Sequence, residues 1–372
     1  MIGTRIQRYI FWKCVLSLSM VLGIFIITIM LVDTVEQLRT VGGDVNLSPT
    51  QAIALSAMRL PSLIEQTFPF AILAAAMMTY NQLSKTSELS VIRATGQSAW
   101  QLLAPVVFLA VLLGLLSMMV RNPAGAYLSE NFESTRARLL EEGGQRADLA
   151  REDIWLRQGS AEGQIVIHAQ SVDSTGQVFS NVKFLEEGRQ YENGRTTDQY
   201  RFVRRIDAQQ ARIVDGFWQL TGIIENTPDN APQRMDKLAI ETDLDPNTLL
   251  TRFTSPDTVG FWGLPGFIRQ TSQAGLDASQ FTMRFFGLTA LPVLYAAMAL
   301  IGAIVCLRLS RLGGTSQLVA TGAMSAVGLF FVTQVALSLG SSGAVVPIIA
   351  AWSPALCAFF IALAILAYKE DG

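Results

Sequence analysis

Charged residues are scarce in this 372-residue chain. Asp, Glu, Lys and Arg make up 16% of it, against about 25% in a typical soluble domain. The shortfall lies in runs without a single charged residue, at 14–32, 66–84, 94–120, 285–307 and 312–368. A membrane-crossing helix needs about 20 apolar residues, and the last run is long enough for two. The runs exclude a soluble protein and predict six transmembrane helices.

Cysteine, histidine and catalytic motifs are also nearly absent. Cys14, Cys306 and Cys357 all fall within apolar runs, so the polar middle of the chain has no disulfide. The single histidine, His168, alternates with Ile167 and so is expected on the other face of a strand, in a structural role. No metal-binding spacing, GxxxxGK[ST] loop or GxSxG elbow occurs. We expect no cofactor and no ATP hydrolysis by this chain.

The apolar runs also contain none of the acids or histidines that form ion relays in pumps, so the energy for any transport must come from elsewhere. Lys and Arg in short loops mark the cytoplasmic side of a membrane protein. Here these residues are Arg5, Arg8, Lys13, Lys85, Arg93, Arg308, Arg311 and Lys369. Their placement puts both termini in the cytoplasm, together with the loop between the second and third predicted helices and the loop between the fourth and fifth. The polar middle of the chain is then in the periplasm. The first apolar run is too long for a cleaved signal peptide and is expected to remain as an anchor.

The polar middle of the chain is large enough to be a domain. It predicts seven short strands, at 153–157, 164–171, 178–185, 199–206, 209–214, 217–221 and 237–241. Glycine-containing turn pairs between them favour an antiparallel sandwich or jelly roll. Residues 130–142 predict a helix leaving the membrane, and 256–273, with its aromatic residues, an amphipathic segment returning to it.

The loop between the second and third runs predicts a short cytoplasmic helix at 84–95, with Gly96 as its end. Two interpretations of this helix are open. Glu88 could be an exposed acid that receives force from a cytoplasmic motor. Alternatively, Glu88 only complements the helix dipole while Leu89 rests on lipid.

Four arginines lie near the periplasmic ends of the predicted helices, where the positive-inside rule does not favour them: Arg39, Arg59, Arg121 and Arg284. They are either anchors whose charged ends reach the interface or part of a pocket for an anionic lipid head group, because arginine binds phosphate with two parallel hydrogen bonds.

Several motifs resemble the LptF/LptG permease family over essentially the whole chain. They are Arg8-Tyr9-Ile10, Ser87-Glu88-Leu89 and Arg93-Ala94-Thr95-Gly96. Within the family, Phe261-Trp262-Gly263-Leu264-Pro265-Gly266-Phe267-Ile268 and Ala350-Ala351-Trp352-Ser353-Pro354-Ala355 look more like LptG than LptF.

The resemblance implies a polytopic α-helical protein of the bacterial inner membrane, with six transmembrane helices (3+3) and an inserted periplasmic all-β jellyroll-like domain. The expected divisions are 1–123 with a coupling helix at 84–95, 124–275, and 276–372. Implied partners are an LptF-like subunit in a heterodimer, an LptB-like ATPase dimer that binds the ATP, and LptC- and LptA-like β-jellyroll proteins. The implied cargo is lipopolysaccharide, and no nucleic acid is expected.

The resemblance also assigns roles to residues of this chain. ATPase coupling falls to Glu88, Leu89, Ile92 and Arg93, and contact with the lipid phosphates to Arg39. Asp33 stands about one turn earlier, where some relatives are basic.

Two rival functions fit fewer of these features. A mechanotransmission subunit, which moves periplasmic partners without translocating substrate, typically has four spans rather than six. A membrane-anchored periplasmic enzyme would need a catalytic set that the polar middle of the chain does not offer.

Overall fold

The computed structural model confirms the predicted number of long apolar helices. It describes residues 2–40, 47–142, 154–160, 163–172, 178–192, 195–214, 216–228, 230–242, 256–273, 277–309 and 315–370. Within these residues, six helices are long and apolar enough to cross a membrane: Arg5–Thr40, Pro49–Lys85, Ala99–Arg136, Ser279–Cys306, Val319–Ser341 and Pro347–Tyr368. The chain is therefore a polytopic helical membrane protein. Asp153 and Arg311, which the sequence places in a strand and a loop, lie outside the described residues.

The chain divides into two compact units. Met1–Glu133 and Ser255–Gly372 form a helical unit, and Ser134–Thr254 form a β unit. The flanking parts of the expected 124–275 domain thus group with the helices, because α5 (Asn122–Glu142) continues from α4 (Ala99–Leu116) through a π-helical turn, Ser117–Arg121. The predicted helix at 130–142 is the second half of α5.

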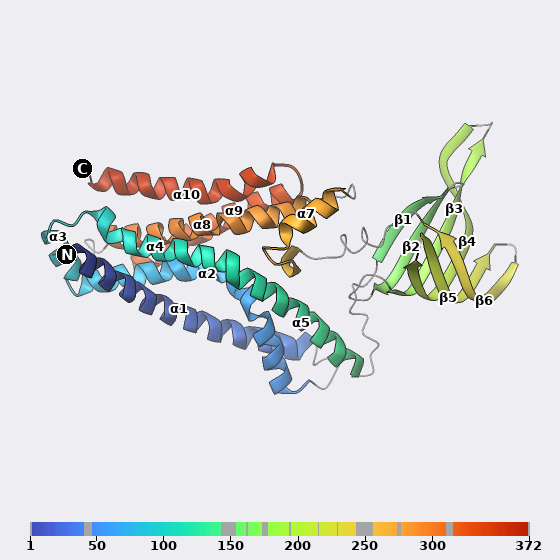
Figure 1. Ribbon diagram of the computed structural model, residues 1–372, viewed down its shortest axis with the longest axis horizontal. Helices are drawn as coiled ribbons and strands as arrows, with labels where there is room; N and C mark the ends of the chain where they lie inside the picture. Colours follow the sequence, from blue (N-terminus) through green and yellow to red (C-terminus); the bar gives the residue numbers. More distant parts are fainter. Residues whose placement is uncertain are drawn as a thin grey trace. The chain divides into compact units, whose positions relative to one another are not determined.

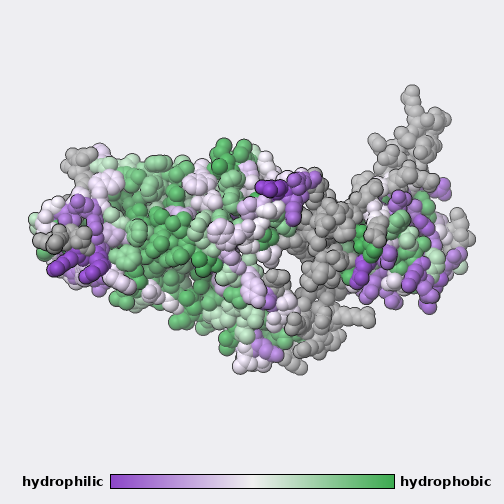
Figure 2. Space-filling view, in the orientation of Figure 1, coloured by the Kyte–Doolittle hydropathy of each residue, from purple (hydrophilic) through white to green (hydrophobic). Residues whose placement is uncertain are grey.

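The remaining helices of the helical unit follow in chain order (Figure 1). They are α1 (Ile2–Thr40), α2 (Pro49–Lys85), α3 (Glu88–Ala94), α7 (Leu264–Gln273), α8 (Ser279–Leu309), α9 (Thr315–Ser341) and α10 (Pro347–Glu370). The spanning helix α8 is the most buried, and α1 and α9 are the least. The α4 and α8 backbones pack in contact at Gly114, where an added Cβ would overlap Pro292. Figure 2 shows the hydrophobic belt that these helices present.

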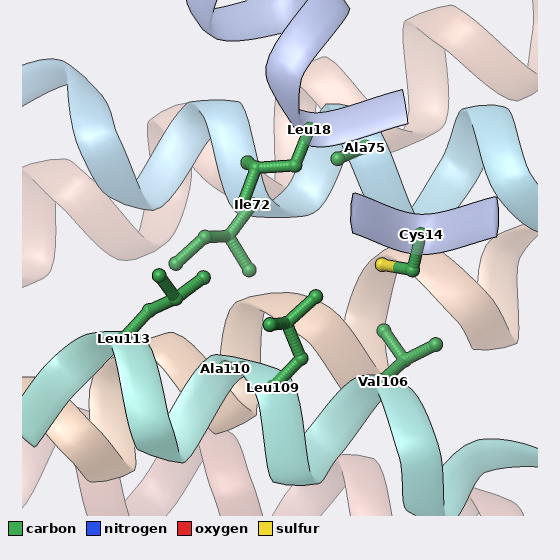
Figure 3. A pocket seen from close by; sticks show the side chains of 8 residues that line it. All are labelled: Cys14, Leu18, Ile72, Ala75, Val106, Leu109, Ala110 and Leu113. Atoms are coloured by element: carbon green, nitrogen blue, oxygen red, sulfur yellow. The ribbon is translucent and has the colours of Figure 1, made fainter. Parts of the chain in front are cut away.

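Apolar residues fill the space between α1, α2 and α4 (Figure 3). Their contact leaves a void of about 10 Å³, lined by Cys14, Leu18, Ile72, Ala75, Val106, Leu109, Ala110 and Leu113. This is about the size of one water molecule, and an apolar lining offers water no hydrogen bonds. At this contact, α2 therefore packs against α1 and α4 with no more than a water-sized void.

The β unit is one antiparallel sheet whose strands lie in chain order, β1 to β6. The strands are β1 (Ile154–Ser160), β2 (Gly163–Val172), β3 (Val178–Glu192), β4 (Arg195–Val214), β5 (Phe217–Thr227) and β6 (Asn230–Glu241). One face is buried around Phe179, Phe184 and Trp218. His168 lies on the other face, as its alternation predicts, against Trp155 with the two ring centroids 4.4 Å apart.

The first strand of the sheet also meets the end of the last. The Gln158 side-chain amide of β1 donates to the Glu241 carbonyl of β6 (3.1 Å) and accepts from Thr242 Oγ1 (2.7 Å) and from Trp218 Nε1 (3.3 Å). Such contacts require the sheet to curl. The jelly-roll topology itself stays a prediction, since the strands follow one another as a meander.

One strand prediction was wrong. The strands expected at 199–206 and 209–214 are a single strand, β4. The buried positions change phase between Ala208 and Ala211, since Gln209 and Gln210 are both exposed. The strand continues through Asp207 because the pairing with β3 and β5 is unbroken there, and Arg205 forms an ion pair with the Asp207 carboxylate (2.7 Å).

Candidate functional site

The short helix α3, between the second and third spanning helices, is the first candidate site. It begins at Glu88 rather than 84, because Ser84 and Lys85 still belong to α2. Ser87 adopts a left-handed conformation (φ 61°) that separates the two helices, and Gly96 (φ 81°) follows the end of α3 as predicted. The left-handed residues on either side hold α3 as a separate seven-residue helix.

Leu89 and Ile92 attach α3 to the helical unit. Both are buried and belong to the main apolar cluster, which also includes Leu83 and Leu102. Leu89 therefore does not rest on lipid, contrary to one interpretation of the sequence. Nor do Leu89 and Ile92 offer a surface to another protein; they fix the helix that carries the exposed residues.

Glu88 links α3 to α1 through three donors. Its carboxylate accepts hydrogen bonds from Tyr9 Oη (2.7 Å), Thr86 Oγ1 (2.9 Å) and Lys13 Nζ (3.1 Å). The Tyr9 hydrogen bond, followed by those from Thr86 and Lys13, lowers the pKa of Glu88, although partial burial acts in the opposite direction. We call Glu88, Tyr9, Lys13 and Thr86 the Glu88 cluster.

The sequence interpretation did not assign Tyr9 and Lys13 to this site. Their spacing of four residues puts them on one face of α1, and that pattern is the signal that was available. The exposed surface of α3 consists of Ser90, Val91, Arg93 and Ala94, with Val91 64% exposed. Glu88 itself keeps 34% of its side chain exposed, enough for a second partner to reach the carboxylate.

The four arginines proposed for lipid head groups do not form one group. Arg39 is exposed at the end of α1, with no partner among the residues that the structure describes. Arg59 on α2 instead forms an ion pair with Asp33 on α1 (3.1 Å), and its guanidinium lies over the Phe132 ring. Asp33 is thus the internal partner of Arg59.

Arg121 and Arg284 are also used within the chain. Arg121 donates to Ser117 Oγ and the Pro61 carbonyl, 3.2 and 3.3 Å away. Arg284 on α8 pairs with Glu65 on α2 (2.6 Å) and with Asp257 (3.3 Å).

Two of these acids correct the sequence interpretation of the spanning segments. Asp33 and Glu65 lie within spanning helices, outside the charge-free runs, with only 8% and 15% of their side chains exposed. Each is neutralised by an arginine from a neighbouring helix. They are therefore structural ion pairs rather than a chain of proton-carrying groups.

Comparisons with known proteins match nearly the whole length of the chain. The family model "Lipopolysaccharide export system permease LptF/LptG" matches residues 8–368. The "Lipopolysaccharide export system permease protein LptG" of Escherichia coli K12 is 22% identical over 379 residues, covering 98% of both chains. The protein of the same name from Escherichia coli O6:H1 gives the same values.

Proposed function

Because this chain belongs to the LptF/LptG family of lipopolysaccharide export permeases and is similar to LptG, we propose that it is the LptG-type half of an ABC transporter in the bacterial inner membrane. It pairs with an LptF-like chain above an LptB-like ATPase dimer. ATP hydrolysis by that dimer extracts lipopolysaccharide from the outer leaflet. The β unit, on the periplasmic side, passes the lipid to LptC- and LptA-like proteins.

The observation that carries this proposal is the geometry of α3. A helix that transmits force must be rigidly attached on one side and exposed on the other. Leu89 and Ile92 supply the attachment, and Val91 and Arg93 supply the exposed surface. The Glu88 cluster joins this helix directly to α1, one of the two least buried spans. Movement of α3 therefore has a route into the membrane that bypasses α2.

Variants of Glu88 and Lys13 test whether a partner uses Glu88. Glu88→Gln keeps the shape but removes the charge, whereas Lys13→Met removes only the internal cation. If a basic group of the ATPase approaches Glu88, Glu88→Gln lowers ATP-driven lipopolysaccharide release at least about tenfold. Lys13→Met lowers it less than about threefold. Gln101→Ala, an exposed change at the start of α4, is the matched control.

The assay uses the complete permease–ATPase complex in vesicles, and pull-down of the ATPase is measured alongside. Equal effects of Glu88→Gln and Lys13→Met would mean that Glu88 serves only the internal cluster. Wild-type activity for both variants would refute the coupling role of α3.

For the cargo, we propose that Arg39 binds the lipid phosphates, because it is exposed and, unlike the other three arginines, has no internal partner among the described residues. A photo-crosslinker at position 39 should capture lipopolysaccharide in the complex. The same crosslinker at Trp12, exposed nearer the other end of α1, should capture phospholipid. Capture of bulk phospholipid at both positions would contradict the cargo assignment. A crosslinker at Ile167, on the buried face of β2, tests passage through the β unit.

The mechanotransmission alternative predicts that no lipid enters the spanning helices. The six spans of this chain count against it, and lipopolysaccharide capture at position 39 would separate the two functions directly.

A further inference from the structure

The third spanning helix changes form part-way along its length. Between α4 and α5, Ser117–Arg121 form a π-helical turn, in which the Asn122 N–H donates to the Ser117 carbonyl five residues earlier. Turns of this kind are rare and occur frequently at functional sites. Arg121 ties the turn to α2, because its guanidinium donates to the Pro61 carbonyl (3.3 Å). A different part of the chain holds the turn from another side.

The segment that returns from the β unit is fastened to this turn by two hydrogen bonds. The Phe261 backbone N–H donates to Asn122 Oδ1 (2.9 Å), and Trp262 Nε1 donates to the Met119 carbonyl (3.1 Å). Asn122 is only 3% exposed, so water does not compete for its amide oxygen. We call Met119, Asn122, Phe261 and Trp262 the return clamp.

Aromatic packing extends the return clamp to α8. The Phe261 ring stacks on the Phe285 ring of α8, with centroids 5.5 Å apart and planes within 6° of parallel. Phe261 is buried and belongs to an apolar cluster with Met118 of the π-helical turn and Leu288 of α8. The π-helical turn, the returning segment and this part of α8 therefore form one packed body.

The order of the elements gives this packed body its place in the machine. The helix α4 follows α3 directly in the chain and continues through the π-helical turn into α5, which leads to the β unit. The chain re-enters the helical unit at Ser255, shortly before the return clamp. Both covalent connections of the β unit are thus attached at one turn of the third spanning helix. A shift of α4 that follows α3 carries both connections with it.

We propose that the return clamp makes both connections of the β unit move with the third spanning helix, and that Asn122 is a positioning residue for the transfer of lipid to the β unit. This inference rests on the proposed function, which supplies the movement of α3 and the lipid. Two connections that moved separately would let the β unit turn freely, so lipid leaving the helices would meet no fixed entrance. The clamp therefore stays closed throughout the transport cycle.

The first experiment measures lipopolysaccharide captured by photo-crosslinkers at positions 39 and 167 in the complete permease–ATPase complex. Asn122→Ala leaves the buried Phe261 N–H without its acceptor. It should lower capture at position 167 about tenfold, with capture at position 39 and ATP hydrolysis within about twofold of wild type. Trp262→Phe removes a single hydrogen bond from an exposed side chain and should lower capture at position 167 about threefold. Gln101→Ala is the control.

The second experiment replaces the hydrogen bonds of the return clamp by a disulfide. A Cβ added at Gly260 would lie 3.5 Å from Pro123 Cβ, within the range that disulfides require. Oxidation of Pro123→Cys with Gly260→Cys should restore transfer in the Asn122→Ala chain, and reduction should abolish it again. In the otherwise wild-type chain, the same disulfide should leave transfer within about twofold, because the two segments already move together. The single-cysteine variants, treated with the same oxidant, are the matched controls.

Three results would overturn the inference. Unchanged capture at position 167 in Asn122→Ala, with lipopolysaccharide captured at both positions in wild type, would show that the clamp does not position the β unit. Arrest of transfer by the disulfide in the otherwise wild-type chain would show that the returning segment leaves the third spanning helix in each cycle. A loss in Asn122→Ala that the formed disulfide does not restore would show that Asn122 acts through folding alone. Absence of lipopolysaccharide at both positions in wild type would instead refute the proposed function itself.

Discussion

The two ends of the helical unit use the same chemistry in different surroundings. At the end that carries α3, the Glu88 cluster joins α3 to the N-terminal part of α1, with Glu88 34% exposed. At the other end, the Asp33–Arg59 and Glu65–Arg284 pairs join neighbouring spanning helices, and their acids are only 8% and 15% exposed. Breaking a buried pair leaves a charge without a partner in a poorly solvated site, whereas water and ions replace an exposed partner. The buried pairs therefore hold the fold together, whereas the exposed Glu88 can exchange partners.

Replacing Arg284 tests this contrast most strongly. Arg284→Met leaves Glu65 buried without its cation, which should cost about 3 kcal/mol of stability. The double variant Arg284→Met with Glu65→Gln removes both charges and should recover most of the loss. Thermal unfolding in detergent, followed by tryptophan fluorescence, measures both. Equal midpoints for the single and double variants would mean that the pair is not buried in the folded protein.

The Asp33–Arg59 pair should show a smaller effect of the same kind. Arg59 is 44% exposed, so water partly solvates whatever remains after its removal. We expect Arg59→Met to cost about 1–2 kcal/mol, between the exposed and buried limits. Asp33→Asn should cost less, because it removes the buried charge itself. The charge-reversed double variant Asp33→Arg with Arg59→Asp should restore stability if the pair acts as a pair. Failure of that variant, with both single variants destabilised, would mean that packing around each side chain matters more than their attraction.

The difference between the two ends also explains what the sequence could predict. The six spans follow from runs without charge, and α3 follows from two apolar residues one turn apart and a terminal glycine. The arginine pairs could not be predicted, because each joins helices far apart in the sequence. Arg284 and Glu65, for example, belong to α8 and α2. The sequence alone therefore does not distinguish Arg39, which has no internal partner among the described residues, from Arg59, Arg121 and Arg284, which do have internal partners.

The same limit applies to Glu88 and to the β unit. The acid and its helix were predictable, but its donors Tyr9 and Lys13 come from α1. In the β unit, most strands follow from alternation. The contacts of Gln158 with Trp218 and Thr242 depend instead on how far the sheet curls, which alternation does not determine.

Removing the cation of the Glu88 cluster should hardly change stability. Lys13→Met leaves Glu88 with Tyr9, Thr86 and water, so the expected cost is below about 1 kcal/mol. The same unfolding measurement used for Arg284→Met provides the direct comparison. A loss as large as that of Arg284→Met would mean that water does not reach Glu88, and the two ends would then be alike.

The smallest effect is a shift in the titration of Glu88. Its pKa in the folded chain lies below the ordinary value of 4.5, so the folded state holds the ionised form more tightly than the unfolded state does. The stability from this cluster is therefore fully present above the unfolded pKa and is lost as the pH falls through the lowered folded value. Infrared difference spectra of wild type against Glu88→Gln should show the protonated carboxyl band only below pH 4.5. Since the Tyr9 hydrogen bond is the largest cause of the shift, Tyr9→Phe should move that band to higher pH. Titration of wild-type Glu88 above the ordinary value, or no response to Tyr9→Phe, would show that the carboxylate is not held by α1, and the proposed route for movement from α3 into the first spanning helix would fail with it.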